Sequence, residues 1–109
     1  MNGYRISLFM QQDQRHAHQP LADWLVQLAR ELGFRGATVF AASEGFGHAG
    51  RVHSAHFFEL GDQSIEVVMA VTEAQSKQLF ERLALEQLKL FYVCAPVEFG
   101  VTGEDGSGR

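Results

Sequence analysis

Apolar residues recur along this chain with two different periods, and these periods predict its secondary structure. Tyr4–Met10 alternates imperfectly and is rich in β-forming residues, which predicts a first strand. In Leu21–Gly33 the apolar residues follow at spacings of three and four, which predicts a helix with one buried stripe that includes Trp24. Pro20 suits the first turn of this helix, where no backbone N–H is needed, and Gly33 suits its end, where a positive φ is favoured. The polar segment Gln11–Gln19 is predicted to be a loop.

The second half of the chain contains further extended segments and a second helix. Three segments are predicted to be extended, namely Ala37–Ser43, Arg51–Leu60 and Ser64–Val71. Thr72 is followed three residues later by Gln75, the spacing of a capping box, so a second helix is expected to begin there.

The last extended segment is predicted over Leu88–Phe99, and it contains Pro96. A proline cannot donate to a strand ladder, so Pro96 requires an edge, a bulge or the end of the strand. After this segment the chain consists of glycine, serine and charged residues, which predicts a disordered tail over residues 102–109.

The order of these elements predicts an α+β fold. It is the ferredoxin-like βαββαβ arrangement, an antiparallel sheet with two helices on one face and an extended region between the second and third strands. One domain over residues 1–101 accommodates all of the elements. Strands such as Ser64–Val71 place apolar residues on both faces, and the chain offers no third helix to cover the second face. We therefore expect copies of the chain to self-associate.

Composition narrows the class of protein. The 109 residues are 46% apolar, enough for one core, but the apolar runs are too short to span a bilayer. A formal charge of −4 with scattered lysines and arginines argues against nucleic acid as a partner. The N-terminus does not resemble a secretion signal, and the single cysteine, Cys94, fits a reducing cytoplasm. Cys94 lies in an apolar run and is expected in the core.

The densest candidate chemistry lies in the segment between Gly36 and His53, which reads GATVFAASEGFGHAGRVH. Its turn Gly45-Phe46-Gly47 contains glycines that can take positive φ and expose backbone N–H groups to an anion. Arg51 can donate two parallel hydrogen bonds to a phosphate or carboxylate, and His53 can gain charge near neutral pH. These features predict an anion-binding loop, although a Gly-Phe-Gly turn also serves as a plain connection.

This pattern, GATV followed by EGFG and R-x-H-S, resembles the PII-like family known as domain of unknown function 190. More distantly it resembles the PII signalling proteins, and the likeness covers nearly the whole chain apart from the tail. The resemblance implies a trimer whose sheets face a shared centre. It also implies a regulatory role, in which a small ligand bound in an intersubunit cleft is reported to a partner such as a membrane transporter or channel.

The resemblance also assigns site residues. Thr38 matches the threonine that starts the second strand, Gly45-Phe46-Gly47 matches the turn after it, and Lys89 resembles the lysine that opens the last strand. Two parts of the PII nucleotide site are missing, however. The glycine-rich basic loop is replaced by Ala84–Leu88, and the arginines after the last strand are replaced by the acidic stretch Gly100–Asp105. We therefore expect weak ATP binding or none, with a nucleotide of fewer phosphates or another small anion as the ligand, and no resident cofactor.

Two other functions remain open from the residues alone. The five histidines suggest a metal-binding trimer, but neither His16 and His18 nor His53 and His56 have the spacing of a structural zinc site. A small ferredoxin-like monooxygenase with an aromatic pocket is the second alternative, because the chain contains nine phenylalanines and Trp24. Glu44 beside the glycine turn is a conceivable general base, but no nucleophile–base pairing can be identified. We expect no catalytic activity and no metal site within one chain.

Overall fold

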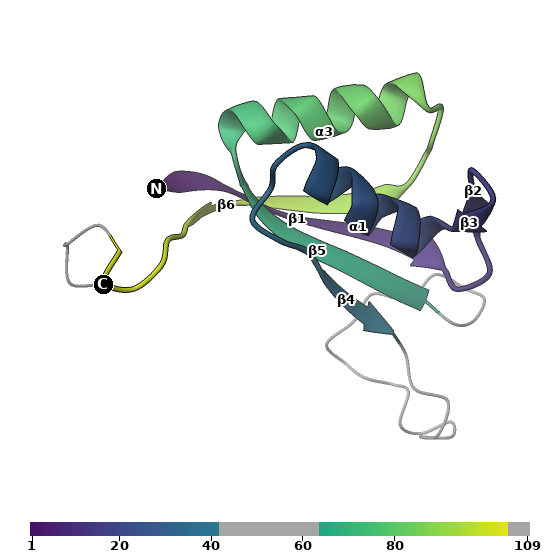
Figure 1. The fold of residues 1–109 in the computed structure, drawn as a ribbon, viewed down its shortest axis with the longest axis horizontal. Coiled ribbons are helices and arrows are strands. Elements are labelled where there is room, and N and C mark those ends of the chain that lie inside the picture. Colours follow the sequence, from purple (N-terminus) through teal and green to yellow (C-terminus); the bar gives the residue numbers. More distant parts are fainter. Residues whose placement is uncertain (42–63, 105–109) are drawn as a thin grey trace.

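A computed structural model describes residues 1–41 and 64–104 of the chain. The described part consists of a main sheet, two helices and a small hairpin (Figure 1). In chain order the elements are β1 (Asn2–Gln11), β2 (Arg15–His16), β3 (Gln19–Pro20), α1 (Leu21–Glu31), β4 (Thr38–Ala41), β5 (Ser64–Thr72), α3 (Glu73–Leu85) and β6 (Phe91–Glu98).

The main sheet has four described strands in the order β4-β5-β1-β6, and each neighbouring pair is antiparallel. The first and third strands of the βαββαβ unit lie in the centre and the second and fourth at the edges, as in the ferredoxin-like fold. Both helices cover the same face of this sheet (Figure 1). The predicted fold class is therefore confirmed. The expected strand Arg51–Leu60 lies outside the described residues.

The two helices begin and end close to the predicted residues. The Thr72 side chain accepts a hydrogen bond from the Gln75 backbone N–H at 3.1 Å, and the Thr72 N–H donates to the Gln75 side chain at 2.9 Å. This confirms the capping box. Helix α1 begins at Leu21 with Pro20 as its N-cap. Both helices end in Schellman-type turns, in which a residue with positive φ, Gly33 or Gln87, follows the C-cap.

The core lies between the helices and the sheet. Its largest fully buried side chains are Ile6, Leu8, Leu21, Leu25, Leu28, Leu79, Val67 and Val71. Trp24 joins this cluster from α1 with 8% of its surface exposed, so its predicted burial is confirmed. Phe34, just after the turn that ends α1, is also buried and fixes the direction in which the chain leaves the helix.

Two expectations about local structure were wrong. The segment Gln11–Gln19 is not a plain loop, because Arg15–His16 and Gln19–Pro20 pair as a hairpin. Ala17 and His18 at its tip have φ of 51° and 68°, the region that a type I′ turn requires but that glycine and asparagine usually occupy. The second error is Cys94, which is exposed because its strand β6 lies at the edge of the sheet. The same edge position accommodates Pro96, as the sequence predicted.

Candidate functional site

The face of the sheet opposite the helices, which we call the open face, carries exposed apolar side chains. Side chains alternate between the two faces of a strand, so the odd-numbered residues of β1 point to the open face while Ile6 and Leu8 point to the core. Register then places Phe9 beside Phe91, whose ring centroid lies 5.6 Å away, and Ser7 beside Val93. Phe91 and Val93 are each 46% exposed. No helix in the described part of the chain covers this surface (Figure 1).

Two site residues assigned from the sequence, Thr38 and Lys89, are described, and they lie at opposite edges of the sheet. Thr38 is exposed at the start of β4 and pairs with Val68. Lys89 is exposed two residues before β6, in the segment that leaves the Schellman turn at Gln87. β4 and β6 are three strand spacings apart, and at about 4.8 Å per spacing the distance between these two strands is roughly 14 Å. One chain therefore does not bring Thr38 and Lys89 together.

The remaining predicted site residues are Gly45, Phe46, Gly47, Arg51 and His53, and all of them lie outside the described residues. Their assignment stays a prediction. The same holds for His48 and His56, which the metal alternative would also require.

A hollow of about 570 Å³ lies at the open face beside Thr38, which lines it. We call it the Arg5 hollow, because the Arg5 side chain projects from the central strand β1 on this face. Small residues contribute to the space: Ala70, which pairs with Arg5 on the neighbouring strand β5, lines the hollow together with Gly36. Its volume is within the range of small-molecule pockets.

Two further lining residues come from segments that lie outside the strands. Arg35 precedes β4, and Phe99 follows β6. The Arg35 Nη2 lies 3.7 Å from the Glu104 Oε1, with the two side chains 68% and 61% exposed. Sequence reasoning missed both arginines of this hollow. The available signal was Arg5, the one charged residue within an otherwise uncharged first strand.

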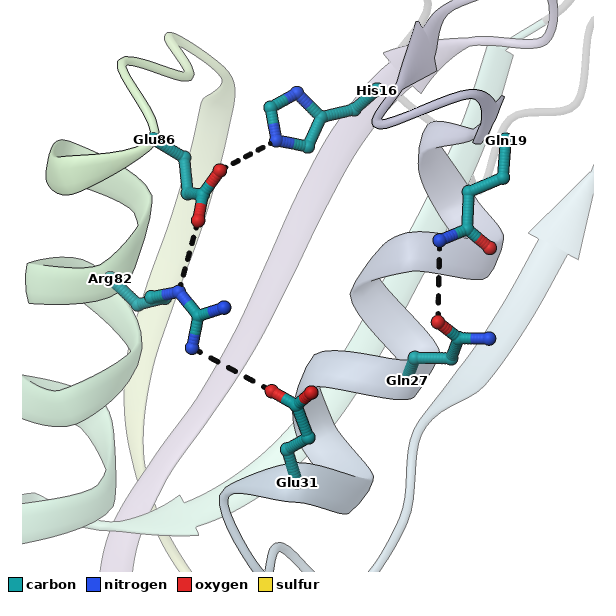
Figure 2. A network of polar contacts seen from close by, with 6 residues as sticks. All are labelled: His16, Gln19, Gln27, Glu31, Arg82 and Glu86. Carbon is teal, nitrogen blue, oxygen red and sulfur yellow. Dashed lines mark hydrogen bonds and ion pairs between the residues drawn. The ribbon is translucent and has the colours of Figure 1, made fainter.

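A second polar cluster ties the hairpin to the two helices on the opposite face of the sheet (Figure 2). Glu86, just after α3, accepts from the Arg82 Nε at 3.1 Å and lies 2.8 Å from the His16 Nε2. Arg82 also lies 3.7 Å from the Glu31 carboxylate of α1. The Trp24 and His16 rings are nearly perpendicular, with centroids 4.6 Å apart, and the Arg82 guanidinium carbon lies 5.8 Å from the Trp24 ring centroid.

The electrostatics of this cluster centre on Glu86. Hydrogen bonds from His16 and from Arg82 hold the pKa of the Glu86 carboxyl below its ordinary value of 4.5, because both donors favour the charged form. His16 is therefore engaged with Glu86 in this structure. Sequence reasoning missed the pairing, since the two residues are 70 positions apart.

The described residues also bear on metal binding and on membrane insertion. No three of their His, Cys, Asp and Glu side chains come together in a group that could hold a metal ion. Neither described helix is long and apolar enough to cross a membrane.

The fold and the open face define a class of protein: a ferredoxin-like α+β domain with helices on one sheet face and an apolar surface on the other. Comparison with known proteins places the chain in a family. The model of the family domain of unknown function 190, described as "Uncharacterized ACR", matches residues 3–94, and the chain belongs to this family. It is similar to a UPF0166 protein of Aquifex aeolicus (strain VF5), with 29% identity over 72 residues that cover 66% of this chain and 68% of the relative.

Proposed function

We propose that this protein is a PII-like regulator that binds a small anionic ligand, such as an adenine nucleotide with few phosphates, between the subunits of a trimer. In this proposal it is a binding protein of the cytoplasm without catalytic activity, and it reports the ligand to a partner such as a transporter or channel. The regulatory role rests on the resemblance of the sequence to PII proteins. The structure adds support for the assembly and for the location of the site.

The observation that carries the proposal is the placement of Thr38 and Lys89 at opposite edges of one sheet. A ligand that contacts both residues must lie between two copies of the chain, with Thr38 from one copy and Lys89 from the next. Closed rotational symmetry provides such head-to-tail contacts. Exposed Phe91 and Val93 on the open face favour association as well, because contact with another copy removes their apolar surface from water.

The two alternative functions receive less support. A metal-binding trimer would use histidines, but His16 is hydrogen-bonded to Glu86 and sits on the opposite face from the open face. A monooxygenase would need an aromatic pocket between helix and sheet. In the described part of that interface, Trp24 and Phe34 are instead packed in the core with the aliphatic side chains.

A subunit-mixing experiment tests the proposal. Calorimetry with AMP and ADP should show binding to the wild type and weakened binding to both Thr38→Ala and Lys89→Ala. When the two variants are unfolded together, refolded and titrated, about a quarter of the sites should regain both wild-type residues if subunits mix at random in a ring. Refolding each variant separately is the matched control.

Recovery of binding in the mixture, and in neither variant alone, is the expected result. If the wild type binds neither nucleotide, or if the mixture binds no better than the separate variants, the intersubunit site is wrong.

A further inference from the structure

The hairpin over residues 15–20, in which β2 pairs with β3, has few contacts of its own to hold its shape. Each of its strands has two residues, and an isolated two-stranded hairpin is marginal in water even when its strands are longer. Its tip residues Ala17 and His18 have φ of 51° and 68°, a region that residues with a Cβ seldom adopt. The conformation of this hairpin therefore depends on its contacts with the rest of the chain.

Side-chain hydrogen bonds connect the 15–20 hairpin to α1 and to the end of α3 (Figure 2). The Gln19 Nε2 donates to the Gln27 Oε1 of α1 at 3.2 Å, and this contact is exposed to water. The His16 Nε2 lies 2.8 Å from the Glu86 Oε1, and only 20% of the His16 side chain is exposed. Water competes less for a donor and acceptor that are partly buried, so the His16–Glu86 contact is the stronger of the two.

Glu86 lies at the turn that leads the chain from α3 to β6. It is the C-cap residue of α3, and its second carboxylate oxygen, Oε2, accepts from the Arg82 Nε at 3.1 Å. Arg82 thus leaves the Oε1 to His16. In the turn itself Gln87 has φ of 58°, and the Leu88 N–H donates to the carbonyl of α3 five residues earlier at 3.0 Å. A turn with positive φ at a residue other than glycine needs support from its surroundings, and the hairpin supplies it through Glu86.

Lys89 follows this turn directly. Its neighbours Leu88 and Leu90 are partly buried against the core, whereas Lys89 is exposed between them. The backbone conformation of the turn therefore decides in which direction Lys89 leaves the molecule. A contact made three residues earlier, at Glu86, can control that direction without touching a ligand.

We propose that the His16–Glu86 contact is a latch, through which the 15–20 hairpin fixes the turn after α3 and so positions Lys89. The turn is ordered while the hairpin is docked and becomes less ordered when the hairpin undocks. The effect of the latch on ligand affinity rests on the proposed function, in which Lys89 contacts the ligand. Coupling between two sites is reciprocal, so a ligand held by Lys89 favours the docked hairpin in turn.

Amide hydrogen exchange of the full chain, followed by NMR, measures the latch directly. The reporter is the Leu88 N–H, whose hydrogen bond to the Leu83 carbonyl requires the turn to keep its conformation. The Phe34 N–H is the internal control, because it closes the equivalent turn after α1 by donating to the Ala29 carbonyl at 2.9 Å. His16→Ala should raise the exchange rate of Leu88 by about tenfold, the effect of losing one hydrogen bond to a charged group, and should leave Phe34 unchanged.

Matched variants separate the latch from a general loss of stability. His16→Gln retains an N–H donor at nearly the position of the histidine Nε2 and should restore most of the protection of Leu88. Gln19→Ala removes the exposed contact of the hairpin with α1 and should change Leu88 exchange by less than about threefold. Ala17→Asn together with His18→Gly supplies the residue pair that a type I′ turn prefers, so this double variant should slow Leu88 exchange severalfold.

Calorimetry with AMP and ADP tests the effect of the latch on the ligand. His16→Ala should weaken binding of the nucleotide that the wild type prefers by severalfold. The same nucleotide, added to the wild type, should slow exchange of the Leu88 N–H, as reciprocal coupling requires.

The latch is wrong if His16→Ala leaves Leu88 exchange unchanged, if it raises Phe34 exchange equally, or if His16→Gln protects Leu88 no better than His16→Ala does. Faster Leu88 exchange with unchanged nucleotide affinity in His16→Ala would overturn the role of the latch in positioning Lys89. If the wild type binds neither nucleotide, the proposed intersubunit site fails, and the exchange rates alone decide whether the latch exists.

Discussion

Replacing Trp24 with alanine should destabilise the folded chain more than a typical single substitution. The side chain is 8% exposed and is packed into the core of α1 and the sheet. A buried tryptophan removes roughly 200 Å² from water, which at about 25 cal/mol per Å² corresponds to about 5 kcal/mol. That figure is an upper bound, because the unfolded chain already buries part of its surface, and we expect roughly 3–5 kcal/mol for Trp24→Ala.

This loss is large compared with the stability of a small domain, which is about 5–15 kcal/mol. Urea unfolding followed by circular dichroism measures it, at one fixed protein concentration because assembly adds to apparent stability. Arg30→Ala is the matched control, an exposed position on the same helix whose change should cost less than about 0.5 kcal/mol. A loss below about 1 kcal/mol for Trp24→Ala would show that Trp24 is not a core residue in solution.

Three further predictions follow from particular contacts. Hydrogen bonds from His16 and Arg82 lower the pKa of Glu86, so its stabilising contribution should be present above pH 4.5 and be lost as pH falls through the lowered pKa. Glu86→Gln should therefore reduce the urea midpoint at neutral pH and not at pH well below 4.5, and an equal reduction at both would contradict this. Gly3→Ala should destabilise the sheet by about 1–3 kcal/mol or more, because the new Cβ would collide with the Val71 carbonyl oxygen; thermal unfolding unchanged from wild type would refute the close approach. Val93→Asp places a charge on the open face at a position 46% exposed, and light scattering should show dissociation while circular dichroism stays native; an intact assembly would mean that another surface mediates association.

Much of the fold could be predicted because it depends on local patterns. The stripe of α1 follows from the spacing of apolar residues, and the start of α3 follows from Thr72 and Gln75. In the described part of the chain no helix covers the second face of the sheet, and this was also predictable, because β5 is apolar on both sides and the sequence pattern indicates only two helices. In each case the necessary information lies within one segment or in a simple count of elements.

Other features could not be predicted because they depend on long-range contacts or on strand position. The 15–20 hairpin has Ala17 and His18 at its tip, residues that do not usually indicate such a turn, and it is held by a contact to Glu86 across 70 positions. Cys94 lies in an apolar run, and only its place on an edge strand makes it exposed. Likewise, Arg5 and Arg35 are 30 positions apart in the sequence, and they line the same hollow only once the sheet has formed.

We propose that this chain functions as a trimer in which Thr38 of one copy and Lys89 of the next contact one ligand. Sedimentation equilibrium of the full chain at micromolar concentration tests this most directly. We expect a single species of three times the 12.1 kDa mass of one chain. A species of 12.1 kDa that persists across the concentration range would contradict both the assembly and the intersubunit site.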